Sequence, residues 1–432
     1  MKRIKHMKNS IGIFLFSAML MAGCSSSNTP SKRIPEAQVR SMGQQAADVP
    51  DEMSVLAIKS KYLLKDSTQT KVFLYVDAYK GKNRMSVETF LASYNLNYVI
   101  YSDYGTRDRL GYGNVKLSAE NVQLKDEKIV VTYEFDSPKK DQGVLLSELS
   151  QIGTLKKVLN DLTIPFGQQQ TNDVYAIFDL QSNIPLQRHY VRTSETILIN
   201  SLQQKTTPLQ VFYYSHDFDP AGSPMNTSAK SGAPTLNIDS SFTILSGKAI
   251  RFEKEGLYNI FADTTQQEGM GILVVNDRFP KTTQPELLLE PLLYMSTNTE
   301  IKEIQTSENY KKSLDKYWLS LMNGNAPLAQ QTIQNFYARV EDANNLFTTY
   351  KEGWKTDKGM IFIVLGPPDK VQRSKDKEVW TYTQRGNAQN VNFTFNRRNN
   401  QFVDDHYELV RYAEYQPIWY PAVEAWRNGI IR

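Results

Sequence analysis

The chain has 432 residues, which is too long for one ordinary globular domain and suits two or three. Hydrophobic residues make up 40% and charged residues 22%, which excludes wholesale disorder, a collagen-like repeat and a protein that crosses the membrane many times. The formal net charge is +4, and four cations (Lys2, Arg3, Lys5 and Lys8) lie in a short leader without acidic residues. Without that leader the formal charges balance, so the net charge gives no support for nucleic-acid binding.

The first 23 residues have the three parts of a secretory signal. A basic stretch is followed by an apolar run from Ile11 to Ala22, which is too short to span a bilayer stably. The segment ends in Leu20-Met21-Ala22-Gly23-Cys24, which resembles the lipobox of bacterial lipoproteins. The resemblance implies that residues 1–23 are a signal peptide, that Cys24 is lipidated, and that acyl chains such as palmitate hold the protein on a membrane.

Cys24 is the single cysteine of the chain, so no intramolecular disulfide can form. The alternative is an ordinary secreted protein with a structural cysteine, but one thiol at the end of a leader is explained most simply by lipidation. Residues 24–55 begin with Cys24 and three serines and are expected to be a flexible tether. An uncharged serine after the cysteine is compatible with an outer-membrane location in the cell envelope. No later stretch approaches 18 apolar residues.

From Lys71 to about Asn276 the apolar residues recur with a period of two. Short strands separated by polar turns, without regular helices between them, indicate antiparallel β-sandwiches. We expect two sandwiches, at 56–193 and 194–284, which divide near Ser194. Pro220 to Pro234 is rich in Gly, Ser, Pro and Asn and is expected to be a surface loop.

After Pro285 the apolar spacing changes to three and four residues. It predicts one helix over Ser307 to Met322 and a second one that begins at Pro327. Strands are expected at Ile361 to Leu365, Val379 to Thr381, Val391 to Phe395 and Glu408 to Arg411. The predicted fold class is therefore mainly β with an α+β C-terminal domain at 285–432, made of a helical hairpin and a small antiparallel sheet.

The most specific motif lies in this C-terminal part. Gly353-Trp354-Lys355-Thr356-Asp357-Lys358-Gly359 is followed by an apolar run and by Gly366-Pro367-Pro368-Asp369. Together with Phe336-Tyr337-Ala338-Arg339-Val340 upstream and Trp426-Arg427-Asn428-Gly429 at the end, this segment resembles the GWxTD-domain family over about residues 295–432. The resemblance implies an exported bacterial protein of a kind common in Bacteroidota and often lipidated. It identifies a family more than an activity.

The motif is interpreted as a structural junction. Gly353 and Gly359 are expected to adopt backbone conformations with positive φ where a helix gives way to a strand. Trp354 would be an apolar anchor, Thr356 or Asp357 would accept hydrogen bonds from the turn, and the segment Gly366, Pro367, Pro368 and Asp369 would end the strand. Two alternatives remain, in which Asp357 binds a ligand or takes part in catalysis.

No recognised catalytic, phosphate-binding or metal-binding signature is present, and no cofactor or metal is expected. The clusters His216-Asp217-Phe218-Asp219 and Asp404-Asp405-His406 are the densest sets of possible metal ligands, and we interpret both as solvated turns. Lys351 to Arg398 carries an excess of basic residues, which favours a solvated face or contact with an anionic surface.

Three functions follow from these observations. The first is a lipid-anchored, non-enzymatic scaffold subunit of an outer-membrane assembly, export or transport complex, with protein partners in the envelope and no nucleic acid. The second is a carbohydrate- or peptidoglycan-binding lipoprotein, with sugars stacked on Phe212, Tyr213 and Tyr214 or on Trp419, Tyr420 and Trp426. The third is a hydrolase that uses paired carboxylates.

Overall fold

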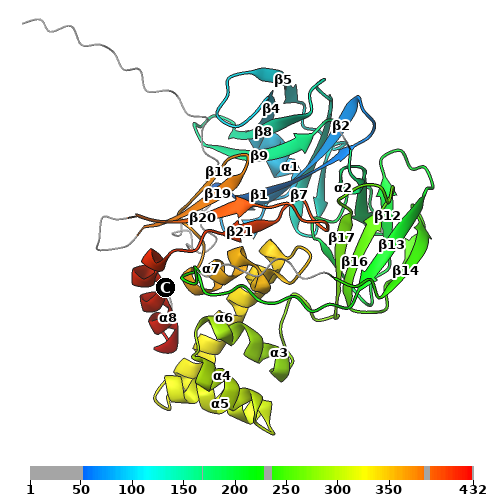
Figure 1. Ribbon diagram of the computed structural model, residues 1–432. Helices are drawn as coiled ribbons and strands as arrows, with labels where there is room; N and C mark the ends of the chain where they lie inside the picture. Colours follow the sequence, from blue (N-terminus) through cyan, green and yellow to red (C-terminus); the bar gives the residue numbers. More distant parts are fainter. Residues whose placement is uncertain (1–51, 168, 228–235, 384–389, 431–432) are drawn as a thin grey trace, which may run out of the picture. The chain divides into compact units, whose positions relative to one another are not determined.

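The computed structural model describes residues 52–167, 169–227, 236–383 and 390–430. All described residues belong to one compact unit. The leader, Cys24 and most of the expected tether therefore lie outside the described residues. Figure 1 shows the strands and helices of the described part in chain order.

The first strands form two antiparallel sheets. One sheet has the order β1-β2-β7-β6 with β3 paired to β2, and the other has the order β5-β4-β8-β9. The helix α1 (Val87–Ser93) begins at Ser86, whose hydroxyl accepts a hydrogen bond from the backbone N–H of Thr89. The strands are β1 (Met53–Leu64), β2 (Gln69–Lys80), β3 (Asn83–Arg84), β4 (Tyr94–Tyr101), β5 (Arg109–Val115), β6 (Val122–Lys125), β7 (Lys128–Asp136), β8 (Gln142–Gln151) and β9 (Lys157–Pro165).

The inner faces of these two sheets share one core, as the alternating pattern predicts. Val72 and Leu74 of β2 pack in the same cluster as Leu96 of β4 and Leu145 of β8. The outer face of the first sheet is buried as well, because Phe73 and its neighbours pack against the later strand β10 (Tyr175–Phe178). This second contact explains why β2 is buried on both faces rather than on alternate residues.

A second pair of sheets follows. They have the orders β10-β12-β15 and β11-β17-β16-β13-β14, and the pair β11–β17 is parallel. The change from the first set of strands to the second falls between Pro165 and Tyr175, ahead of the expected division near Ser194. The helix α2 (Thr171–Val174) lies at this change. The strands are β10 (Tyr175–Phe178), β11 (Tyr190–Arg192), β12 (Ile197–Ser201), β13 (Pro208–Tyr214), β14 (Ser240–Leu245), β15 (Ala249–Ile250), β16 (Gly256–Phe261) and β17 (Met270–Val275).

The helical part begins where the apolar period changes. Both predicted helices are present, α5 (Tyr310–Leu321) and α6 (Ala326–Phe347), and they pack through Trp318 against Phe336. Asn325 caps the start of α6 by accepting a hydrogen bond from the N–H of Leu328. The other elements of this part are α3 (Pro285–Leu289), the 3₁₀ helix η1 (Glu290–Tyr294), α4 (Asn298–Gln305), the 3₁₀ helix η2 (Gly353–Lys355) and α7 (Asp357–Leu365).

A four-stranded antiparallel sheet and a last helix complete the fold. The strands follow each other in the order β18-β19-β20-β21, and the Trp-rich end forms α8. The predicted fold class is confirmed, since the structure is mainly β with C-terminal helices followed by a small sheet. The elements are β18 (Lys370–Arg373), β19 (Lys377–Thr383), β20 (Asn390–Arg397), β21 (Tyr407–Leu409), the 3₁₀ helix η3 (Ala413–Tyr415) and α8 (Gln416–Arg427).

One predicted strand is wrong. Ile361 to Leu365 belongs to the helix α7, which Thr356 caps at its start and Gly366, where φ is 82°, caps at its end. Residues Met360 to Val364 are all buried, so the helix is apolar on every side and lies inside the core of the C-terminal part. A short continuous apolar run has no periodicity that separates a buried strand from a buried helix.

Candidate functional site

The two glycines of the motif are required by close packing rather than by backbone angle. A side-chain β-carbon at Gly353 would lie 2.0 Å from the carbonyl oxygen of Ala343, and one at Gly359 would lie 1.9 Å from that of Gly353. Neither residue has a positive φ, so that expectation is wrong. The end of α6, the turn and the start of α7 therefore approach each other at distances that only glycine permits.

The backbone N–H and carbonyl group of Trp354 both make hydrogen bonds that stabilise this turn. Its N–H donates to the side-chain oxygen of Asn344 (3.1 Å), and its carbonyl oxygen accepts from the hydroxyl of Tyr294 (2.9 Å). The amide group of Asn344 in turn donates to the carbonyl oxygen of Pro280 (3.0 Å). The tryptophan side chain is 5% exposed and is part of the main C-terminal core, so it is the apolar anchor that the motif predicts.

Thr356 caps helix α7. Its hydroxyl accepts a hydrogen bond from the N–H of Gly359 (3.0 Å) and donates to the carbonyl oxygen of Gly353 (2.7 Å). The side chain thus closes the turn from one side and starts the helix on the other.

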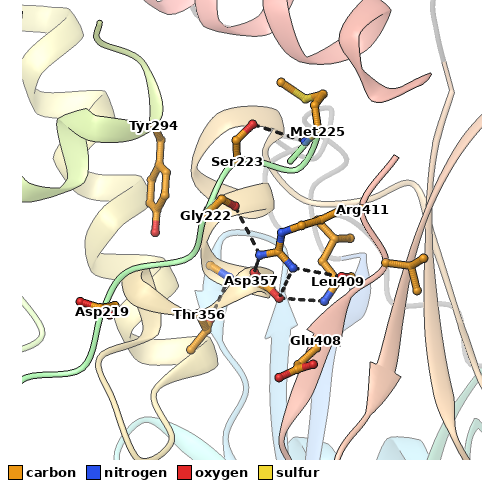
Figure 2. A network of polar contacts seen from close by, with 12 residues as sticks. Asp219, Gly222, Ser223, Met225, Tyr294, Thr356, Asp357, Glu408, Leu409 and Arg411 are labelled. Carbon is orange, nitrogen blue, oxygen red and sulfur yellow. Dashed lines mark hydrogen bonds and ion pairs between the residues drawn. The ribbon is translucent and has the colours of Figure 1, made fainter. Parts of the chain in front are cut away.

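Asp357 is the buried charge of the motif, and Figure 2 shows the contacts around it. The guanidinium group of Arg411 donates to both carboxylate oxygens, at 2.6 and 3.3 Å, and the N–H of Leu409 donates to one of them at 2.8 Å. Arg411 also donates to the carbonyl oxygens of Leu409 and Gly222. Asp357 therefore ties the start of α7 to β21 and to the loop after β13, and its acceptor sites face protein donors.

The Gly-Pro-Pro-Asp segment follows α7 and leads into the small sheet. Gly366 has a positive φ, and its carbonyl oxygen accepts from the hydroxyl of Tyr382 (2.8 Å). Pro368 is buried, Pro367 is half-buried, and the exposed Asp369 accepts a hydrogen bond from the N–H of Thr383 (2.6 Å). The segment ends a helix instead of the predicted strand.

Lys355 is a buried cation within the motif. Its ammonium group lies 2.5 Å from the carboxylate of Asp217 and 3.2 Å from that of Glu352, and it lies over the ring of Trp354 at 5.4 Å. Asp217 belongs to the cluster that begins at His216, so one acid of that cluster contacts the motif. Among the residues that the structure describes, no group of three or more His, Cys, Asp or Glu residues is arranged to hold a metal ion.

A second buried ion-pair network lies on the hairpin β18–β19. The carboxylate of Glu378 accepts from Arg373 (3.0 Å), Lys358 (3.3 Å) and the indole N–H of Trp380 (2.5 Å). Burial alone would raise the pKa of Glu378, but the charges of Lys358 and Arg373 lower it to about 2. Arg373 also contacts Asp161 of β9 at 3.2 Å, so this network joins the small sheet to the first sandwich.

These pairs account for part of the basic excess between Lys351 and Arg398. Lys355, Lys358 and Arg373 all point to acidic partners inside the molecule. Fewer cations therefore remain for contact with an external anionic surface than the sequence alone indicates.

A cavity of about 510 Å³ lies beside the motif. Its lining comes from β1, β9, the segment before β11, the end of α6, the start of α7 and the segment before β21. It includes Asp404, Asp405 and His406, which the sequence analysis interprets as a solvated turn, and Lys59, Lys61 and His189, which it did not single out. Lysines in a strand pattern resemble the exposed face of a sheet, so sequence alone offers no signal that they line a cavity.

The aromatic residues considered for sugar stacking are mostly used in packing. Tyr214, Trp419 and Trp426 are buried, and the indole N–H of Trp426 donates to the carbonyl oxygen of Val364 (3.1 Å). Phe212 and Tyr213 are half-buried against neighbouring rings, whereas Tyr420 is 56% exposed.

No motif in the sequence points to Arg411 or Glu378 as residues of the site. Arg411 follows β21, and its partner Asp357 lies 54 residues away in the chain, whereas Glu378 lies in β19 and its partners Arg373 and Lys358 are nearer in sequence. The one available signal for Glu378 is its place directly opposite Arg373 in the hairpin.

These contacts define a protein of several antiparallel sheets whose C-terminal helices and small sheet are organised around one Gly-Trp-Lys-Thr-Asp turn. Residues 256–428 match the family model of the GWxTD domain, and the chain belongs to the proteins that carry this domain. The match begins earlier than the resemblance seen in the sequence, because it includes β16 and β17 of the second sandwich.

No curated protein matches the chain. Among solved structures, the chain is similar to the crystal structure of red sea bream transglutaminase, with 9% sequence identity and a TM-score of 0.18. That similarity covers 52% of this chain and 31% of the transglutaminase chain, and it is too weak to carry an argument about fold or activity. In the part of the chain that the structure describes, no helix is long and apolar enough to cross a membrane.

Proposed function

We propose that this protein is a lipid-anchored lipoprotein of the cell envelope that acts as a non-enzymatic scaffold subunit of an outer-membrane assembly, export or transport complex. The observation that carries the proposal is the sequence Leu20-Met21-Ala22-Gly23-Cys24, which places the single cysteine directly after a basic and apolar leader. Several acyl chains, each CH₂ contributing about 0.8 kcal/mol when buried, would hold the protein on a membrane almost permanently.

The surroundings of the family motif support a role without catalysis. A catalytic carboxylate must reach a substrate, whereas Asp357, although it is among the residues that line the cavity, is 6% exposed, and its carboxylate accepts hydrogen bonds from Arg411 and Leu409. The motif is placed where the C-terminal helices, the small sheet and the loop after β13 meet. Its polar atoms are used to hold these parts together.

An exposed sheet edge supports a role in partner binding. Strand β14 pairs with β13 and lies at the end of its sheet, and its sequence from Ser240 to Leu245 contains no charged residue or proline. Phe242 is 38% and Leu245 49% exposed. Sheet edges usually carry charges or proline to prevent pairing with other chains, so an edge without them is suited to a partner strand.

The lipid anchor is tested by labelling intact cells with radioactive palmitate and purifying the chain. The unchanged protein is expected to carry the label and to sediment with membranes, and Cys24→Ser is expected to lose both properties. Ser26→Ala is the matched control and should keep both. Absence of label from the unchanged protein contradicts the proposed anchor.

The scaffold role is tested by a photo-crosslinking amino acid placed at position 245 on the edge of β14. Irradiation of intact cells is expected to join the chain to one or a few envelope proteins. The same group placed at the exposed Lys316 on α5 serves as the control and should give much weaker products. If position 245 gives no product beyond this control, the edge is not a docking surface. Saturable turnover of a substrate by the purified chain would contradict the non-enzymatic role.

A further inference from the structure

Two lysines of one strand line the cavity beside the motif. Lys59 and Lys61 of β1 stand opposite Tyr75 and Phe73 of β2, whose side chains belong to the outer face of the first sheet. Residues directly opposite in an antiparallel pair point to the same face, so both lysines extend from that outer face. Both line the cavity, together with His189 from the segment before β11.

These three side chains are available for a ligand. Among the described residues, neither lysine ammonium group and neither ring nitrogen of His189 has a hydrogen-bond or ion-pair partner. Both lysines are half-buried, and a charge partly removed from water without such a partner destabilises the folded state. Burial accordingly lowers the pKa of each lysine to about 8.

The cavity also carries negative charge on a different segment. Asp404 and Asp405 lie in the chain that leads from β20 to β21, and both line the cavity. Burial lowers the pKa of both lysines. The negative charge of Asp405 raises the pKa of Lys59, and that of Asp404 raises the pKa of Lys61, so each acid opposes the effect of burial. Within the described residues neither carboxylate makes an ion pair or hydrogen bond. The two acids are therefore near the two lysines but separated from them.

Lys59, Lys61, Asp404 and Asp405 thus bring two charges of each sign to the cavity, from two different segments and without ion pairs between them. An anion would be attracted by the lysines and repelled by the acids. A cation would be attracted by the acids and repelled by the lysines. A small molecule with one charge of each sign satisfies both sides at once. We propose that the cavity binds a small zwitterion with a free carboxylate and a free amino group, such as an amino acid or a short peptide.

In this site the ammonium groups of Lys59 and Lys61 and the ring N–H of His189 donate to the ligand carboxylate. The carboxylates of Asp404 and Asp405 accept from the ligand amino group. Lys358 and Arg373, which also line the cavity, are held by Glu378 and form part of its wall. Binding of such a ligand requires neither the lipid anchor nor the scaffold role.

The site is tested by titration calorimetry with alanylalanine and the full-length chain purified in detergent. Alanylalanine is expected to bind, while its N-acetylated form and its C-terminal amide, which each lack one charge, bind at least about tenfold more weakly. No binding of alanylalanine at millimolar concentration, or equal binding of the three compounds, overturns the proposal.

Substitutions locate the site within the cavity. Lys59→Met, Lys61→Met and Asp404→Asn are each expected to weaken alanylalanine binding about tenfold or more. Lys316→Met, on the exposed face of α5, is the matched control and should bind like the unchanged chain. If the three cavity variants also bind unchanged, the site lies elsewhere and the proposal is overturned.

Thermal unfolding at pH 7 separates a binding role from a structural one. Because the two lysines are unpaired, Lys59→Met and Lys61→Met are expected to keep or raise the unfolding temperature while losing affinity. Loss of affinity that occurs only together with a lower unfolding temperature would assign these lysines to the fold and overturn the proposal.

Discussion

Asp357 shows how a single residue of the motif is used. Its buried carboxylate faces Arg411, whose side chain is only 12% exposed, so each charge depends on the other. Removal of one member of a buried pair leaves the second charge without compensation, which costs more than the pair itself contributes.

Asp357→Asn is therefore expected to destabilise the protein by about 3 kcal/mol or more, since the new amide would place a donor beside the guanidinium group. Urea unfolding followed by tryptophan fluorescence measures the change. Asp369→Asn, at the exposed acid of the same motif, should have little effect.

The double variant Asp357→Asn with Arg411→Met tests the same pair. It is expected to be less destabilised than the sum of the two single changes, because the unpaired charge is removed. Strict additivity would show that the two side chains are not energetically coupled.

The glycines of the motif lead to a second prediction. Gly353→Ala is expected to destabilise by roughly 1–3 kcal/mol or to prevent folding, because the new methyl group would overlap the carbonyl group of Ala343. Gly222→Ala is the control, since a β-carbon there meets no atom within 4 Å and the residue has no positive φ. Equal unfolding midpoints for the two variants would contradict the close approach.

At the scale of elements, α7 shows why the sequence can suggest the wrong structure. Its β-branched and aromatic residues favour a strand, yet Thr356 caps a helix at its start and Gly366 ends it. The helix is stabilised by burial on all sides, because the long helix α6, the helix α8 and the strand β21 surround it. Tertiary packing thus overrides the local preference of the residues.

The hairpin β18–β19 leads to a prediction about acid. Glu378 has a pKa of about 2 in the folded protein against 4.5 as its ordinary value, so it binds a proton more readily after unfolding. Its ion pairs therefore contribute stability that is fully present above about pH 4.5 and is lost as the pH falls towards 2.

Glu378→Gln removes this contribution. The variant is expected to unfold more easily than the unchanged chain at pH 6, and the difference between the two should shrink steadily between pH 4.5 and pH 2. Urea midpoints measured across this range provide the test. A difference that stays constant with pH would show that the carboxylate is not held ionised by Lys358 and Arg373.

At the scale of the whole molecule, ion pairs are among the contacts that connect the C-terminal part to the sheets before it. Arg373 reaches Asp161 of the first sandwich, and Lys355 reaches Asp217 in the loop after β13. The cavity also takes its lining from all of these parts. A ligand in it would therefore contact segments that are far apart in the sequence.

Lys355→Met is expected to loosen the attachment of the loop after β13. The methionine keeps an apolar side chain against Trp354 but cannot form the ion pair with Asp217. Hydrogen exchange followed by mass spectrometry should show faster exchange in residues 215–223, with little change in β2. Lys316→Met should leave this loop unchanged. Unaltered exchange in both variants would show that Lys355 does not hold the loop.

The sequence by itself determined the alternating strands, the start of α6 at its proline, the helical change after Pro285 and the family motif. These features depend on local periodicity, caps and short spacings, which neighbouring residues specify without the rest of the chain. Only the tertiary structure decided that Ile361 to Leu365 is a helix, that Gly353 is needed for packing, and that Asp357 meets Arg411. Each of these depends on segments distant in the chain, whose contacts form only when the sheets and helices pack together.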